Sequence, residues 1–222
     1  MSEASLDLAI LGGTFDPVHI GHLQIAKVVS DLLSARICWV PSNVPPHKPS
    51  TVATPDQRLT MLRLAVSDQP EFYVDDLELD RGDISYTLET LKIFRRRMGP
   101  LPRLYFILGM DAYQSLPSWQ GWQQLLDYAH LVVCRREAEH LPAPSLLAFE
   151  ASHRVATTDM LKSSAHGRLF FVDNAVLPIS STEIRAQFEN KGNPSALLDP
   201  AVYAYILKEP LYTASKLIRK PK

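Results

Sequence analysis

The sequence reads Gly12-Gly13-Thr14-Phe15-Asp16-Pro17-Val18-His19-Ile20-Gly21-His22 directly after an apolar run, Leu6–Leu11, and at the start of a helical pattern. The glycine pair lets the backbone turn tightly and approach a ligand without a Cβ in the way. The N–H groups at the start of the helix offer a seat for an anion. His19 and His22 are at i and i+3, so they fall on one helix face and both imidazoles can point at the same ligand. Strand, glycine turn, helix start and paired histidines together predict a phosphate-binding site.

Two other interpretations compete with a phosphate site. A glycine pair often makes a turn and nothing more, and two histidines at this spacing could be half of a metal site. No cysteine or third histidine lies nearby to complete a zinc set, and Asp16 is the only carboxylate in reach. The glycines at positions 12, 13 and 21 do not form the G-x-G-x-x-G of a Rossmann dinucleotide site, and the Gly-Lys-Ser/Thr of a P-loop is absent. The phosphate site is therefore the favoured interpretation.

The composition is that of an ordinary globular protein, with 222 residues, 46% hydrophobic and 21% charged. A net charge of −1 gives no electrostatic reason to expect nucleic acid as a partner. The segment Met1–Asp7 has no signal-peptide character, and no apolar run approaches the roughly 20 residues needed to cross a bilayer. Cys38 and Cys134 stand in apolar runs, as buried free thiols of a reducing compartment do. We therefore expect a cytoplasmic protein without a membrane partner.

Apolar strand patterns alternate with helical patterns along the chain. We expect strands at Leu6–Leu11, Ile37–Val40, Phe72–Leu79, Leu104–Leu108, Leu131–Cys134 and Arg168–Val172, and helices at Ile20–Leu33, Asp56–Asp68, Ser85–Met98 and Asp111–Tyr128. This alternation predicts an α/β fold, a Rossmann-like, open, mostly parallel sheet with helices on both faces. The length suits a single domain over residues 1–222, with a small helical C-terminal part from about residue 180.

The segments that suggest chemistry all follow predicted strands. In open α/β sheets, ligands bind outside the carboxyl ends of the strands, so segments at that edge are expected to converge on one site. These segments are Gly12–His22, Pro45–Lys48, Leu108–Asp111, Cys134–Arg136 and Ile179–Arg185.

The segment Ile179-Ser180-Ser181-Thr182-Glu183-Ile184-Arg185 predicts a second anion seat. Ser180 and Glu183 have the spacing of a capping box, which marks a helix start. A helix start rich in hydroxyls, with Arg185 one turn further on, suits a negatively charged ligand. Taken alone, the segment is better explained by a plain helix cap with an exposed arginine. The first motif changes this balance, because the two segments together offer two seats for one polyphosphate.

Both segments resemble signatures of the nucleotidyltransferase superfamily. The first resembles the (T/H)-x-G-H signature, and Ile-Ser-Ser-Thr-x-Ile-Arg resembles the C-terminal signature of the adenylyltransferases, which grips the β- and γ-phosphates of ATP. His19-Ile20-Gly21-His22 also matches the class I aminoacyl-tRNA synthetases letter for letter. A chain of 222 residues leaves no room for a tRNA-binding domain, and the lysine-rich second synthetase signature is missing.

The remaining motifs resemble those of the bacterial nicotinate-nucleotide adenylyltransferases, over about Leu6 to Tyr212. They are Pro45-Pro46-His47-Lys48, Ser85-Tyr86-Thr87, Leu108-Gly109-Met110-Asp111, Trp119 and Cys134-Arg135-Arg136, in this order. Only Glu137–His166 matches nothing recognisable. The resemblance implies transfer of AMP from ATP to nicotinate mononucleotide, giving nicotinate adenine dinucleotide and pyrophosphate. It implies Mg²⁺ bound through ATP, with no metal cage of protein side chains.

The resemblance also implies roles for individual residues. ATP is expected to contact Gly12, Gly13, Thr14, Phe15, His19, His22, Gly109, Asp111, Ser181, Thr182 and Arg185. Nicotinate mononucleotide is expected to contact Asp16, His47, Lys48, Tyr86, Thr87, Trp119 and Arg136. Among these, His19, His22 and Arg185 are the expected catalytic residues, since they stabilise charge that moves onto the leaving pyrophosphate.

The acceptor has a physical rationale in the sequence. N–H groups at a helix start opened by Ser85-Tyr86-Thr87 would hold the carboxylate of nicotinate, and would face the amide NH₂ of nicotinamide with donors. Trp119 offers a flat face for the pyridine ring, although a surface aromatic packed on its own turn is also consistent with its position.

Other classes of protein remain open on the sequence alone. They include adenylyltransferases for nicotinamide mononucleotide or phosphopantetheine, and a non-catalytic nucleotide sensor. A Rossmann dehydrogenase is disfavoured, because its glycine fingerprint and the acidic residue for the ribose are missing. The sequence leaves a homo-oligomer possible without predicting one.

Overall fold

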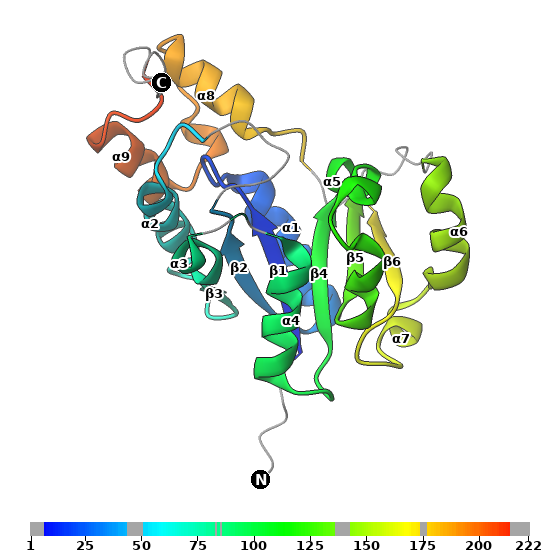
Figure 1. The fold of residues 1–222 in the computed structure, drawn as a ribbon. Coiled ribbons are helices and arrows are strands. Elements are labelled where there is room, and N and C mark those ends of the chain that lie inside the picture. The colour runs from blue at the N-terminus through cyan, green and yellow to red at the C-terminus, as the bar shows by residue number, and fades with distance from the viewer. Residues whose placement is uncertain are drawn as a thin grey trace.

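The computed structural model describes residues 7–43, 51–82, 84, 86–135, 143–173 and 177–213. Within them, six parallel strands form one sheet in the order β3-β2-β1-β4-β5-β6 (Figure 1). The strands are β1 (Leu8–Gly13), β2 (Arg36–Pro41), β3 (Phe72–Val74), β4 (Leu104–Gly109), β5 (His130–Arg135) and β6 (Leu169–Asp173). The strand order reverses between β1 and β4, which makes the carboxyl ends of these two strands the place where a ligand is expected.

Helices cover both faces of the sheet, as predicted. They are α1 (Ile20–Leu33), α2 (Pro55–Val66), α3 (Leu77–Arg81), α4 (Thr87–Met98), α5 (Met110–Gln114), α6 (Pro144–His153), α7 (Thr158–Leu161), α8 (Ser181–Glu189) and α9 (Pro200–Lys208). Short 3₁₀ helices span Leu116–Ser118, Trp122–Asp127 and Ser195–Leu197. The α/β fold class is confirmed.

Alternation along the buried strands divides the core into two layers. On one face, Ala9, Ile37 and Val132 pack with α1, α2 and α9. On the other face, side chains such as Ile10 and Val133 pack with α4, α5, α6 and the 3₁₀ helix after Gly121. In Figure 1, α8 lies beyond the carboxyl ends of the strands, over the edge where the sequence motifs converge.

Two predicted elements are wrong. The predicted strand Phe72–Leu79 ends at Val74, and the chain continues as the short helix α3. Glu78 on this helix is buried and its carboxyl accepts a 2.6 Å hydrogen bond from the Thr90 hydroxyl, a tertiary contact with no local signal. The predicted helix Asp111–Tyr128 is three short helices, because Pro117 stands in the first turn of the second and Gly121, at φ 66°, precedes the third.

Three arginines, Arg95–Arg97, stand in the last turn of α4, and the first of them has a structural role. Arg95 donates hydrogen bonds to the carbonyls of Gly99, Pro102, Tyr128 and Ala165, and so ties together the loops at the amino ends of the strands.

Cys38 and Cys134 are buried free thiols, and burial raises the pKa of each to about 12. Among the described residues, no helix is both long and apolar enough to span a membrane.

Candidate active site

The glycine turn between β1 and α1 is shaped by a packed aromatic ring. Phe15 has a positive φ of 51° and is buried, with its ring edge-on to His22 and tilted against Trp39. A Cβ on Gly13 would come within 2.9 Å of the Phe15 ring, so this position needs glycine. Gly12 and Thr14 lie beside it at the carboxyl end of β1. Gly12 is exposed, whereas the space beside Gly13 is occupied by the Phe15 ring.

The two histidines stack on each other at the start of α1. His19 is the N-cap residue, and the centroids of the His19 and His22 rings are 3.7 Å apart. The main-chain N–H of His19 donates to Nδ1 of His22 over 3.3 Å, which places the proton of a neutral His22 on Nε2.

His19 is buried, and its Nδ1 has no hydrogen-bond partner within the described residues. Burial lowers the pKa of His19 to about 4, so the ring is neutral at pH 7. A Cβ on Gly21 would lie 3.0 Å from this same Nδ1. The glycine thus leaves the room that the His19 ring occupies.

The carboxylate of Asp16 is surrounded by donors from the protein. Its Oδ2 accepts from the main-chain N–H of Val52 at 2.7 Å, and its Oδ1 accepts from the N–H of Ala53 at 3.1 Å. The hydroxyl of Tyr212 donates to the same Oδ1 at 2.7 Å. We call the loop between β1 and α1, residues 14–19, the signature loop. These contacts tie it to the segment before α2 and to the segment after α9. Asp16, expected to contact nicotinate mononucleotide, is thus committed to contacts inside the protein.

Arg58 on α2 also binds the signature loop. Its guanidinium donates to the carbonyl of Thr14 at 2.8 Å and to that of Asn43 at 3.4 Å. Burial lowers the pKa of Arg58, and the charge of Asp16 acts in the opposite direction. Arg58 and Tyr212 carry no signal in the sequence, because their partners lie 44 and 196 residues away along the chain.

The second segment starts a helix and lies against the first. The predicted capping box is confirmed: the hydroxyl of Ser180 accepts from the N–H of Glu183, and the Glu183 carboxylate accepts from the N–H of Ser180, both at 3.2 Å. The hydroxyl of Ser181 donates to the carbonyl of Pro17 at 2.9 Å, and Arg185 donates to that of Asp16 at 2.7 Å. Arg185 also reaches the hydroxyl of Thr182 at 3.3 Å. Two helix starts, of α1 and α8, are thereby fixed to one loop.

The end of β4 borders the same edge of the sheet. Gly109 is the N-cap of α5, and a Cβ there would meet nothing within 4 Å among the described residues. Asp111 stands in the first turn of this helix and is exposed. Because β4 pairs with β1, both residues lie across the switch point from Gly12.

Three of the expected acceptor residues, Tyr86, Thr87 and Trp119, lie on the face of the sheet that α4 covers. α4 begins at Thr87 with Tyr86 as N-cap, and the Tyr86 side chain forms no cap within the described residues. Leu88, in the first turn, lies 2.5 Å from where a Cβ on Gly121 would be, so this helix start packs against the segment that follows Trp119. The Trp119 ring is edge-on to Phe106 of β4 at 6.4 Å between centroids. His47, Lys48, Ser85 and Arg136 lie outside the described residues.

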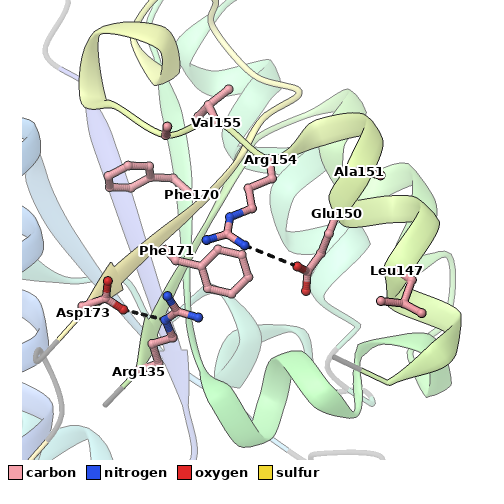
Figure 2. A pocket seen from close by; sticks show the side chains of 10 residues that line it. Arg135, Leu147, Glu150, Ala151, Arg154, Val155, Phe170, Phe171 and Asp173 are labelled. Atoms are coloured by element: carbon pink, nitrogen blue, oxygen red, sulfur yellow. Dashed lines mark hydrogen bonds and ion pairs between the residues drawn. The ribbon is translucent and has the colours of Figure 1, made fainter. Parts of the chain in front are cut away.

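A separate groove of about 680 Å³ lies between the ends of β5 and β6 and helix α6 (Figure 2). There the Phe171 ring is sandwiched between the guanidinium groups of Arg135 and Arg154, at 4.9 and 4.8 Å from its centroid. Arg135 pairs with Asp173, and Arg154 pairs with Glu150 at 3.9 Å (Figure 2). Each arginine is thus paired with a carboxylate. The groove lies near the β6 edge of the sheet, away from the switch point between β1 and β4.

In the described part of the chain, no group of three or more His, Cys, Asp or Glu side chains is arranged to hold a metal ion. The site instead offers backbone N–H groups at helix starts, two stacked imidazoles and a guanidinium. Such a donor set suits the oxygens of a polyphosphate.

This fold and donor set define a nucleotide-binding protein of the nucleotidyltransferase class. Consistent with that class, residues 10–187 match the family described as cytidylyltransferase-like. A probable nicotinate-nucleotide adenylyltransferase of Aeromonas hydrophila is 42% identical over 210 residues, which cover 92% of this chain and 96% of that protein. The protein of the same name from Yersinia pestis is 40% identical over 207 residues, covering 92% and 94%. The chain belongs to the nicotinate-nucleotide adenylyltransferase family.

A solved structure supports the fold independently. Plasmodium falciparum nicotinic acid mononucleotide adenylyltransferase complexed with NaAD superposes with a TM-score of 0.72 at 20% identity, covering 93% of this chain and 97% of that one. The arrangement of the sheet is therefore retained where little of the sequence is.

Proposed function

We propose that this protein transfers AMP from ATP, bound as its Mg²⁺ complex, to nicotinate mononucleotide, releasing pyrophosphate and nicotinate adenine dinucleotide. Membership of the family supports the reaction. The observation that carries the assignment of the site is the pair of hydrogen bonds from Ser181 and Arg185 to the signature loop, at Pro17 and Asp16. These bonds bring the two predicted anion seats to one place.

The reaction needs positioning more than proton transfer. An oxygen of the acceptor phosphate forms a bond to the α-phosphorus of ATP, while the bond from that phosphorus to the bridging oxygen breaks and pyrophosphate leaves with the electron pair. A phosphate monoester has a second pKa near ~6, so the nucleophile is already largely anionic at neutral pH and needs no general base. A His19 whose pKa lies at about 4 suits this chemistry, because a neutral ring can donate a hydrogen bond without being required to accept a proton.

The donors around the switch point divide between the two ends of the triphosphate. We assign His19 and His22 to the α-phosphate and the bridging oxygen, where charge develops in the transition state. The Ser181 and Thr182 helix start and Arg185 hold the β- and γ-phosphates. The backbone of Gly12–Phe15 lines the nucleotide. Gly109 and Asp111 border the ribose, whose hydroxyls can donate hydrogen bonds to the Asp111 carboxylate.

We place the acceptor against α4. The N–H groups of its first turn, at Thr87, face the carboxylate of nicotinate, with Tyr86 beside them, and Trp119 stacks on the pyridine ring. We assign Lys48, Arg136 and His47 to the phosphate end of the acceptor, where the two cations neutralise its charge. This arrangement predicts a preference for the acid over the amide, because an amide NH₂ would face the same donors.

Pyrophosphate release from ATP and Mg²⁺ tests the proposal, with nicotinate mononucleotide and nicotinamide mononucleotide compared as acceptors. We expect fast release with the acid and slow release with the amide. Arg185→Gln should lower kcat/KM by about 10²-fold, the scale on which a transition-state donor acts. Arg154→Gln, which changes an arginine of the groove in Figure 2, should leave it unchanged.

Each other outcome has a definite meaning. Equal rates with the two acceptors would keep the reaction and refute the carboxylate seat at Thr87. No release with either acceptor would refute the reaction and favour a nucleotide sensor. Equal losses in the two arginine variants would refute the role assigned to Arg185.

A further inference from the structure

Three segments distant in sequence meet at the side chain of Asp16. They are the signature loop itself, the stretch Val52–Ala53 before α2, and Tyr212, which follows α9. The carbonyl of the same Asp16 accepts from Arg185. One residue thus connects the loop that carries His19 with the helix start that carries the second anion seat.

Arg58 on α2 makes a second set of contacts to the signature loop. Its bonds to Thr14 and Asn43 fix the beginning of the signature loop and the chain just after β2. Asn43 and Val52 are therefore both tied to the signature loop, one through Arg58 and the other through Asp16. The relative placement of the two segments depends on these side chains.

Tyr212 is built into this cluster at its hydroxyl. The residue is fully buried and has a φ of 61°, in the left-handed region that bulky side chains rarely adopt. Its hydroxyl donates to Asp16, and the sulfur of Met61 lies 3.9 Å away. Burial first, and then the nearby Asp16 carboxylate, raise the pKa of Tyr212 well above its ordinary value, so the hydroxyl keeps the proton that it donates.

We propose that Tyr212 is a positioning residue for nucleotidyl transfer: through its hydrogen bond to Asp16 it holds the signature loop in register with the start of α8 and with Val52–Ala53. The inference rests on the proposed function, since it assigns Tyr212 a part in aligning the two reacting phosphates. Alignment is where a small displacement has a large effect, because a shift of about 1 Å can lower a rate by about 10²-fold.

Tyr212→Phe tests the proposal by removing only the hydroxyl. Its matched control is Tyr203→Phe: both rings contact Phe188, but the hydroxyl of Tyr203 makes no hydrogen bond within the described residues. Both variants are assayed well below their unfolding temperatures, so that only folded protein is compared. We expect Tyr212→Phe to lower kcat about 10-fold or more, with KM for each substrate changed less than about 3-fold, and Tyr203→Phe to match the wild type.

A purely structural hydroxyl would lower the unfolding temperature of Tyr212→Phe and leave kcat of the folded protein unchanged, and that result would overturn the proposal. A rise in KM with kcat unchanged would also overturn it, since the hydroxyl would then act on binding alone.

Hydrogen exchange separates this failure from failure of the proposed function. The amides of Val52 and Ala53 should exchange about 10-fold faster in Tyr212→Phe than in Tyr203→Phe, whatever the reaction is, because the carboxylate that accepts from them loses a partner. Unchanged exchange would refute the coupling even if the wild type is fully active. A wild type that releases no pyrophosphate, with the exchange effect present, would refute the function and leave the coupling standing.

Discussion

His19 and Gly21 share one small space at the start of α1. The ring of His19 fills the volume that a side chain at position 21 would need, with its Nδ1 3.0 Å and its Cε1 3.1 Å from where a Cβ would stand. The glycine in this motif is therefore explained by the neighbouring imidazole rather than by backbone conformation. The sequence predicted that the two histidines share a face, but this steric relation required the rotamer of His19.

Gly21→Ala should separate activity from stability. Alanine favours a helix over glycine by up to about 1 kcal/mol, which offsets the tight contact, so we expect the unfolding free energy to change by less than about 1 kcal/mol. The displaced His19 ring should lower kcat/KM about 10-fold or more. Urea unfolding and steady-state kinetics on the same preparation measure both quantities.

The control for Gly21→Ala is a double-mutant cycle with His19→Ala. If the alanine acts only by displacing the ring, it should change kcat/KM less than about 2-fold once the ring is gone. Full additivity of the two losses would show that Gly21 acts by another route.

Asp16, Arg58 and Tyr212 mark the limit of prediction at the residue scale. The glycines and histidines of the motif carry a local signal, because turn, helix start and spacing can be read within eleven consecutive residues, 12–22. An arginine on α2 and a tyrosine after α9 have no such signal. Their partners are main-chain carbonyls and a carboxylate brought close only by the complete fold.

At the scale of elements, α8 is the part of the site that the sequence predicted best. Its capping box depends on two side chains three residues apart, so the helix start can be recognised without tertiary contacts. The element that the sequence misassigned, α3, is held instead by the distant pair Glu78 and Thr90. Local capping is thus readable from sequence, whereas a short helix held by a tertiary bond is not.

Ser180→Ala should weaken α8 at the end that we assign to the β- and γ-phosphates. Loss of an N-cap side chain lowers stability by about 1 kcal/mol, and the freed first turn should raise KM for ATP several-fold with a smaller change in kcat. Urea unfolding and ATP titrations in the transfer assay check the two effects.

Thr157→Ala is the matched control for this helix. Thr157 caps α7 in the same way, with its hydroxyl accepting from the N–H of Met160 at 3.3 Å, on a helix beside β6. It should lower stability comparably and leave KM for ATP unchanged. A similar rise in KM in both variants would attribute the effect to global weakening.

At the scale of the molecule, the order of the six strands was predictable because buried strands form short apolar runs. The helices α3, α6 and α7 were not predicted. The position of the switch point was not predictable. No sequence signal shows that β1 pairs with β4 as well as with β2. The convergence of motifs at one edge follows from parallel strands, whichever order they take. The contacts between those motifs, such as Ser181 to Pro17, emerge only in the assembled sheet.

Two buried histidines should make the stability of the whole molecule depend on pH below neutrality. Burial lowers the pKa of both His19 and His130 from 6.5 to about 4. His130 is fixed as a neutral ring, since its Nδ1 accepts from the N–H of Arg168 at 3.2 Å and its Nε2 lies 2.9 Å from the carbonyl of Ser164. Between about pH 4 and about pH 6.5, the unfolded chain therefore binds more protons at these two histidines than the folded protein does.

The sign follows from this difference in proton binding. Above about pH 6.5 neither state binds the protons, so this contribution to the unfolding free energy is complete. It falls as pH drops towards about 4, by at most about 1.4 kcal/mol per pH unit for each histidine, and levels off below. Urea unfolding between about pH 7 and about pH 4.5 measures the slope. His130→Gln retains a donor and an acceptor without titrating, so its slope should be smaller; an unchanged slope would show that His130 does not contribute.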